Sequence, residues 1–120
     1  MTLADTSVWI DHLRRGNARL AEMLMDGQIL MHPLVAGELA CGNLRERAAL
    51  LSYLRTLPQA MAASHTEVEH FLEAQAIFGR GLGWIDVSLL ASARLTGCDF
   101  WTLDRRLAAA ALKLGLEWGQ

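Results

Sequence analysis

The sequence that decides the fold is FWTLDRRLAAAAL, residues 100–112. Its first four residues are aromatic, β-branched or apolar, a composition typical of a buried strand. A single acid, Asp104, separates this strand from a helix that we predict over residues 105–114. A strand that passes directly into a helix is the unit from which α/β domains are built.

The same order of strand, acid and helix occurs at the N-terminus. Residues 1–5 are a short apolar run that ends in Asp5-Thr6-Ser7, three residues that favour a helix N-terminus, and residues 8–15 carry apolar side chains at helical spacing. Further strands are predicted at residues 28–31, 57–63 and 116–118, and further helices at residues 18–25, 33–41, 45–55 and 85–95.

One more helix is predicted after Thr66, which forms a capping-box spacing with Glu69. The glycine-rich run 79–83 predicts a flexible loop before the helix at 85–95. Short strands that alternate with helices indicate an α/β fold. We expect a three-layer α/β/α sandwich around a mainly parallel sheet of four to five short strands.

Composition limits the classes of protein to consider. The 120 residues suit a single domain, 1–120, and the hydrophobic fraction of 52% excludes a disordered chain. Cys41 and Cys98 have no partner at a zinc or redox spacing, so we interpret both as small buried residues. No targeting leader or membrane-spanning run is visible, and a cytoplasmic setting is therefore expected.

The net charge of −2 argues against binding nucleic acid by bulk charge alone. However, removing four metal-bound carboxylates from that count leaves +2 for the rest of the chain. An enzyme that acts on an anionic substrate through a metal ion is therefore not excluded by the charge.

Functional groups in α/β sheets gather beyond the carboxyl ends of the strands. Asp5 and Asp104 each follow a predicted strand, and Asp86 lies in the first turn of the helix after the glycine-rich loop. Each of these acids could also serve only as a helix N-cap, a position that aspartate commonly takes. The position of these acids alone does not separate the two interpretations.

Glu38 does not fit the capping interpretation, because it lies within the apolar helical stretch LVAGELA, residues 34–40. A carboxylate buried there needs a cation, a basic side chain or water. The nearest basic residues in sequence, Arg45 and Arg47, lie beyond the helix break at residues 42–43. A salt bridge to a distant arginine is the structural alternative to a metal ion.

Four carboxylates brought together repel one another unless a cation neutralises them. Ligands that are all oxygen suit Mg²⁺ or Mn²⁺ rather than zinc. Such ions activate water and stabilise the charge that develops on a phosphodiester, and one or two of them are compatible with this set of acids.

The chain resembles the PIN-domain ribonuclease toxins of bacterial type II toxin–antitoxin modules, the VapC-like family. The resemblance covers almost the whole chain and is carried by four pieces in order: LADTSVWID at 3–11, Glu38, GWID with LLASA at 83–93, and WTLDRRL at 101–107. Each piece is weak by itself, whereas their order and spacing together are specific.

The resemblance implies that Asp5, Glu38, Asp86 and Asp104 hold Mg²⁺ or Mn²⁺, and that Thr6 and Thr102 support the site by hydrogen bonds. It also implies an endoribonuclease that cuts RNA, a homodimer, and inhibition by a cognate antitoxin whose C-terminal segment covers the groove of the active site.

Arginines near the same sheet edge are candidate RNA contacts, because the planar guanidinium suits phosphate. They are Arg14, Arg15, Arg80, Arg105 and Arg106, and solvated surface charge is the alternative for each. Trp9 and Trp84 flank the predicted site, where they either stack on bases or pack in the core.

Two other classes compete with this prediction. A phospho-receiver domain needs a lysine after the last strand, yet the only lysine is Lys113, within the final predicted helix. The second alternative is a catalytically silent PIN-fold module that binds RNA or protein. The presence of all four acids argues against such a module.

Overall fold

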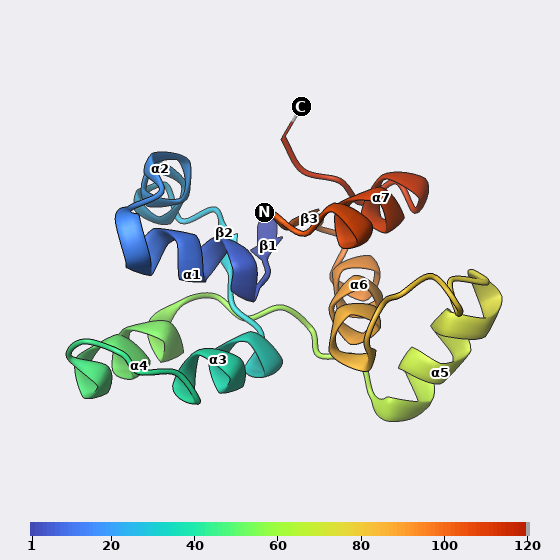
Figure 1. The fold of residues 1–120 in the computed structure, drawn as a ribbon, viewed down its shortest axis with the longest axis horizontal. Helices are drawn as coiled ribbons and strands as arrows, with labels where there is room; N and C mark the ends of the chain where they lie inside the picture. The colour runs from blue at the N-terminus through green and yellow to red at the C-terminus, as the bar shows by residue number, and fades with distance from the viewer. Residues whose placement is uncertain (120) are drawn as a thin grey trace.

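The computed structural model describes residues 1–119, in which three strands form one parallel sheet. The strands are β1 (Thr2–Ala4), β2 (Ile29–Leu30) and β3 (Asp99–Trp101), in the order β2-β1-β3. Figure 1 shows β1 at the centre of the molecule, between helices on both sides. The predicted α/β fold with a parallel sheet is confirmed.

Seven helices connect and cover the strands in the described residues. They are α1 (Thr6–Arg15), α2 (Ala18–Met25), α3 (Pro33–Ala40), α4 (Arg47–Thr56), α5 (His65–Ala74), α6 (Trp84–Thr96) and α7 (Arg105–Lys113). Helices α1 and α2 lie on one side of the strands in Figure 1, and α6 and α7 lie on the other. None of the helices in residues 1–119 is long and apolar enough to span a membrane.

The sheet has three strands in the described chain, so the prediction of four to five is wrong. Segments 57–63 and 116–118 each contribute only one isolated bridge, Met31 with Gln59 and Phe100 with Glu117. Pro58 has no N–H to donate, which limits the first segment. The second segment lies between Gly115 and Gly119, where positive φ angles turn the backbone away from the strand direction.

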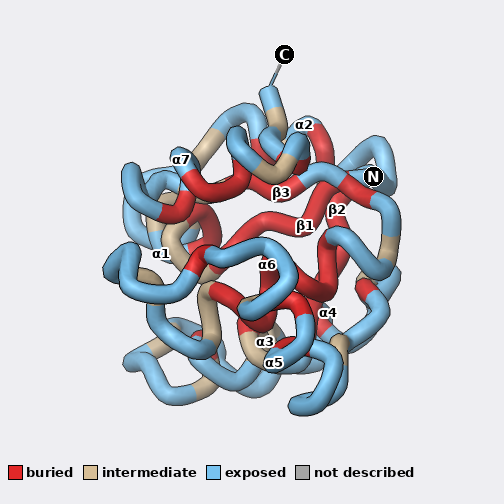
Figure 2. Tube along the Cα trace, turned by 90° about the vertical axis from the view of Figure 1, so that its right-hand side faces the viewer, coloured by how far each residue is buried: buried red, intermediate tan, exposed pale blue. Residues whose placement is uncertain are grey.

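The core is formed by the strands and by α6. Leu3 and Ala4 of β1 are fully buried, and every residue of α6 from Val87 to Ala93 is buried. Figure 2 shows this as red tube in all three strands and along α6. A helix buried around its circumference belongs to the interior of a domain, and its alanines and serines allow close packing. The position of α6 relative to the sheet is therefore fixed by packing.

Helix α5 begins earlier than predicted, and its capping box is Ser64 with Glu67, not Thr66 with Glu69. The Ser64 hydroxyl accepts from the Glu67 N–H at 3.1 Å, and the Glu67 carboxylate accepts from the Ser64 N–H at 2.8 Å. Both pairs have the same spacing, so the sequence did not distinguish them. The Ala63 N–H donates to the Ser92 hydroxyl of α6 at 3.0 Å, and this contact fixes where the chain enters α5.

The two cysteines differ in environment. Cys98 is buried as predicted, whereas Cys41 is exposed, so the prediction for Cys41 is wrong. Cys41 is the C-cap of α3, and the chain turns out of the helix at this point. A residue at an exposed helix end has little to pack against.

Candidate active site

Asp5 lies at the carboxyl end of the central strand and is only 6% exposed. The pairing of Ala4 with Trp101 places Asp5 beside Thr102, the first residue after β3. Both oxygens of Asp5 accept hydroxyl hydrogen bonds: Oδ1 from Ser7 at 2.5 Å and Oδ2 from Thr102 at 2.5 Å. The carboxylate is therefore held in a fixed orientation at the sheet edge.

The same two hydroxyls connect Asp5 to the start of α7. Thr102 Oγ1 accepts from the Asp104 N–H at 3.0 Å, and Ser7 Oγ accepts from the Leu103 N–H at 2.9 Å. Asp104 is exposed and is the N-cap of α7. We call Asp5, Ser7, Thr102 and Asp104 the strand-end half of the site.

Burial raises the pKa of Asp5 above its ordinary value, and the hydrogen bonds from Ser7, Thr102 and Val8 partly oppose this effect. Burial disfavours the ionised form because the charge loses its hydration, while donors favour that form. A cation beside Asp5 would replace part of the lost solvation. This environment is consistent with a carboxylate that is completed by a metal ion.

Glu38 and Asp86 are carried by two helices and, with Thr6, form what we call the helix half of the site. The Thr6 hydroxyl at the start of α1 donates to Glu38 Oε1 at 2.6 Å, which joins α1 to α3. Asp86 is half-buried in the first turn of α6, and its Oδ2 accepts from the Gly83 N–H at 3.2 Å.

The expectation that Glu38 is buried is wrong: its side chain lies on an exposed side of α3. No arginine, lysine or histidine forms an ion pair with Glu38 within residues 1–119. The salt-bridge alternative for Glu38 therefore has no partner in the described chain. A carboxylate that faces solvent without a basic partner is accessible to a cation.

A buried histidine connects the two helices of the helix half. The His32 Nδ1 accepts from the Leu34 N–H at 3.0 Å and thereby caps α3. Its Nε2 lies 2.9 Å from the Ser92 hydroxyl of α6. Because Nδ1 is an acceptor, Nε2 carries the proton and donates to Ser92. This contact fixes α3, which carries Glu38, against α6, which carries Asp86.

The four acids do not form a closed cage. Within residues 1–119, no three carboxylate, imidazole or thiol side chains lie close enough together to hold an ion. The chemistry of the donors nevertheless fits a hard cation, because Glu38, Asp86 and Asp104 each keep one carboxylate oxygen without a hydrogen-bond partner in the described chain. All four candidate ligands supply oxygen, as Mg²⁺ and Mn²⁺ require.

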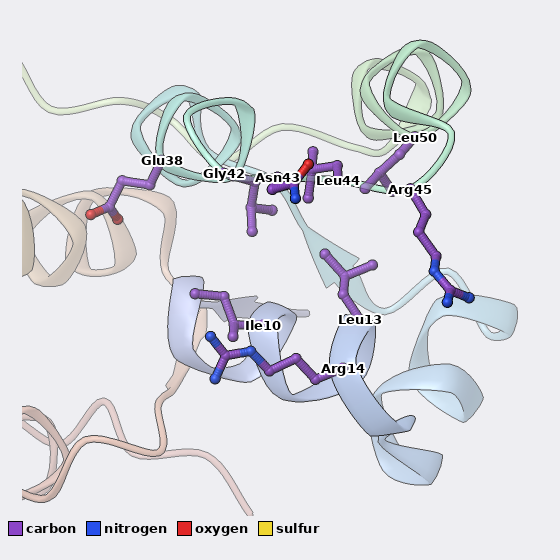
Figure 3. Close-up of a pocket in the computed structure, with 10 residues that line it drawn as sticks. Ile10, Leu13, Arg14, Glu38, Gly42, Asn43, Leu44, Arg45 and Leu50 are labelled. Atoms are coloured by element: carbon purple, nitrogen blue, oxygen red, sulfur yellow. The ribbon is translucent and has the colours of Figure 1, made fainter.

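A groove of about 490 Å³ begins at Glu38 and runs between α1 and the connection from α3 to α4. In Figure 3, Glu38 lies near one end of the groove and Arg45 near the other. Ile10 and Leu13 of α1 face this connection across the groove. Its remaining lining residues are Arg14, Leu39, Gly42, Asn43, Leu44 and Leu50.

The five arginines predicted to contact RNA have different surroundings. Arg15 forms an ion pair with Asp11 at 2.6 Å, and Arg14 lines the same groove as Glu38. Arg106 lies against Gly81. Arg80 and Arg105 are exposed and form no ion pair within residues 1–119.

The two tryptophans near the site are in different environments. Trp9 is buried in the core, whereas Trp84 is 42% exposed and lies against His65, with ring centroids 4.7 Å apart and ring planes tilted by 37°. Only Trp84 therefore presents an aromatic surface to solvent.

Ser7 is the residue of this region whose contacts the sequence analysis missed. It was interpreted only as part of a helix N-terminus, yet its hydroxyl contacts both Asp5 and the segment that leads to Asp104. Its position two residues after the first acid is the one signal that the sequence offered.

Comparison with known proteins shows the family of the chain. A family model described as PIN domain matches residues 2–113. The chain belongs to the PIN-domain family.

Within that family it is 44% identical over 117 residues to Ribonuclease VapC32 from two strains of Mycobacterium tuberculosis, with 97% of this chain and 94% of that protein covered. The match places the chain among the VapC-type ribonucleases.

Solved structures confirm the fold. The toxin VapC20 of Mycobacterium tuberculosis, which cleaves the sarcin-ricin loop, superposes with a TM-score of 0.65 at 22% identity over 92% of this chain and 95% of its own. The protein PAE2754 from Pyrobaculum aerophilum gives a TM-score of 0.60 at 20% identity over 91% of this chain and 78% of its own. At these identities the likeness concerns the fold alone.

Proposed function

We propose that this chain is a single PIN domain, 1–120, that acts as the toxin of a type II toxin–antitoxin module and hydrolyses RNA phosphodiester bonds as a metal-dependent endoribonuclease. The 44% identity to Ribonuclease VapC32 over nearly the whole chain supports the reaction class. The observation that carries the proposal is the set of oxygen donors: Ser7 and Thr102 hold Asp5, Thr6 holds Glu38, and Glu38, Asp86 and Asp104 each keep one carboxylate oxygen without a partner in the described residues.

In this proposal the four acids would hold Mg²⁺ or Mn²⁺. When bound, the ion supplies an activated water and stabilises charge on the phosphodiester oxygens. The protein contributes orientation. Ser7 and Thr102 fix both oxygens of Asp5, while Thr6 directs Glu38 toward the same edge of the sheet.

The helix half would complete the site when the cation binds. Glu38 is exposed and retains one free oxygen, so a change of its side-chain rotamer costs little packing. Asp5 and Asp104 of the strand-end half and Glu38 and Asp86 of the helix half would hold the ion.

RNA would be bound by arginines around the acids. Arg14, Arg80, Arg105 and Arg106 form no ion pair within the described residues, so their donors remain available for phosphate. Arg15 is the weakest of the five candidates, because Asp11 already accepts from its guanidinium.

The groove between α1 and the α3–α4 connection suits a segment of the cognate antitoxin. Ile10, Leu13 and Leu50 give it an apolar lining, and Arg14 and Arg45 give it charge. An amphipathic segment with acidic residues fits this chemistry. Because Glu38 lines the groove, a segment bound there would also obstruct the site. We further propose a homodimer in the cytoplasm.

The test is RNA cleavage by the chain purified without its antitoxin. We expect cleavage with Mg²⁺ or Mn²⁺ and none in EDTA. Asp5→Asn should lower the rate of cleavage by about two orders of magnitude or more, because it removes a candidate metal ligand and not only a residue that supports one. Asp26→Asn is the matched control, because Asp26 is an exposed acid at the end of α2. Cleavage that persists in EDTA and in Asp5→Asn contradicts the proposal.

The catalytically silent binding module is the second candidate. It is favoured by the finding that no three potential ligands are clustered in residues 1–119. RNA or antitoxin binding without any metal-dependent cleavage would support it.

A further inference from the structure

Arg106, in the first turn of α7, packs its side chain against the glycine-rich loop before α6. A Cβ atom placed on Gly81 would lie 2.7 Å from Arg106 Nη1 and 3.3 Å from its Cδ. Both distances are shorter than ordinary contacts between carbon and its neighbours. Gly81 therefore provides the space in which the guanidinium lies.

The guanidinium of Arg106 lies against Gly81 on an exposed residue and has no acceptor in the described chain. Within residues 1–119 the guanidinium makes no ion pair and donates no hydrogen bond, while the backbone N–H of Arg106 donates to the carboxylate of Asp104, the N-cap of α7. Several other arginines are engaged, since Arg15 pairs with Asp11, and Arg47 and Arg94 donate to backbone carbonyls. Arg14, Arg80 and Arg105, like Arg106, form no ion pair within residues 1–119. Arg106 combines a contact with the glycine-rich loop with unused donors.

This contact joins the segments that carry two of the candidate metal ligands. The Arg106 N–H donates to Asp104 Oδ1 at 2.9 Å. Gly81 precedes by two residues Gly83, whose N–H donates to Asp86 Oδ2 at 3.2 Å. The guanidinium thus lies where the loop before Asp86 meets the helix after Asp104.

We infer that Arg106, whose guanidinium occupies the space left by Gly81, binds a phosphate of the RNA backbone beside the acidic site. The inference rests on the proposed ribonuclease function and names one contact to its substrate. A guanidinium presents planar donors that match two phosphate oxygens.

The experiment separates the charge of Arg106 from its placement. Binding of an end-labelled, random-sequence single-stranded RNA to the full chain is measured in EDTA over a series of salt concentrations. Arg106→Ala should weaken binding about tenfold and reduce the slope of log affinity against log salt by about 0.7. Arg106→Lys should keep the slope but recover only part of the affinity, because lysine lacks the planar fork.

Gly81→Ala tests the placement without changing any charge. Its Cβ would displace the guanidinium, and we expect binding about threefold weaker than in the wild type. Gly79→Ala is the matched control: its φ of +72° is close to the +78° of Gly81, so the backbone cost is similar, but nothing lies within 4 Å of the added Cβ. RNA binding by Gly79→Ala should equal that of the wild type.

Equal binding by Gly81→Ala and Gly79→Ala, or an unchanged salt slope in Arg106→Ala, overturns the inference. Failure of the proposed function gives a different result, namely a wild-type chain that binds RNA through Arg106 but does not cleave it with Mg²⁺ or Mn²⁺. Thermal unfolding of each variant confirms that the compared proteins are folded.

Discussion

The strand-end half and the helix half of the site both supply carboxylates, but they hold them in different ways. Asp5 is buried, and its two oxygens accept hydrogen bonds from the hydroxyl groups of Ser7, which follows β1, and Thr102, which follows β3. Glu38 is exposed and accepts one hydrogen bond, from Thr6. One half is fixed by the sheet, and the other depends on side chains that face solvent.

The difference follows from the backbone. Adjacent parallel strands fix the residues just beyond their ends through the sheet register, so Asp5 and Thr102 meet without further adjustment. Acids on helices depend on how the helices pack and on their own rotamers. The comparison therefore indicates that catalysis is more sensitive to the supports of Asp5 than to the support of Glu38.

The largest expected effect comes from removing the hydroxyl group of Thr102, compared with removing that of Thr6. Thr102→Val should lower kcat/KM for RNA about 10- to 100-fold, the range seen when a supporting residue of a metal ligand is lost. Thr6→Val should lower it about threefold, because Glu38 is already free to move. Thr102→Ser keeps the hydroxyl and should retain most activity. Equal losses in the two valine variants would show that the halves are equally dependent on their supports.

The pH dependence of stability tests the burial of Asp5. Its raised pKa means that the folded chain holds this proton to higher pH than the unfolded chain does. Above the ordinary carboxyl pKa the folded state therefore binds more protons, and ionisation of Asp5 lowers stability as pH rises through the raised pKa.

Asp5→Asn has no carboxyl group to ionise at this position and so does not lose stability in this way. The metal-free variant should therefore be more stable than the wild type at neutral pH. Thermal unfolding in EDTA over a pH series measures the effect, with Asp26→Asn as the control for an exposed acid. A variant less stable than the wild type throughout the series would mean that the hydrogen bonds to Asp5 outweigh its burial.

The smallest expected effect concerns the cap of α5, which belongs to neither half. Ser64→Ala should cost about 1 kcal/mol of unfolding free energy, since it removes the acceptor of the Glu67 N–H. Thr66→Ala should leave stability unchanged, and neither variant should alter RNA cleavage. Urea denaturation measures the difference. A loss of activity in Ser64→Ala at full stability would extend the site beyond the two halves.

Much of the secondary structure follows from local sequence. The helix predicted over residues 18–25 has the observed bounds, because Gly16 and Asn17 before it act on the local backbone as the C-cap of α1 and the N-cap of α2. The edge segments around Gln59 and Glu117 were overpredicted as strands. Pairing with a neighbour decides whether apolar residues become a strand, and pairing is not a local property.

The sequence by itself determined which residues carry oxygen donors and that two acids follow parallel strands. Strands and helices could be predicted because the spacing of apolar residues over a few positions indicates them. The tertiary structure decided that the Ser7 and Thr102 hydroxyls both donate to Asp5, that Glu38 is exposed, and that Gly81 accommodates Arg106. These contacts join residues far apart in the chain or choose among neighbours of equal chemistry. They are fixed by strand register and helix packing, which depend on the whole core.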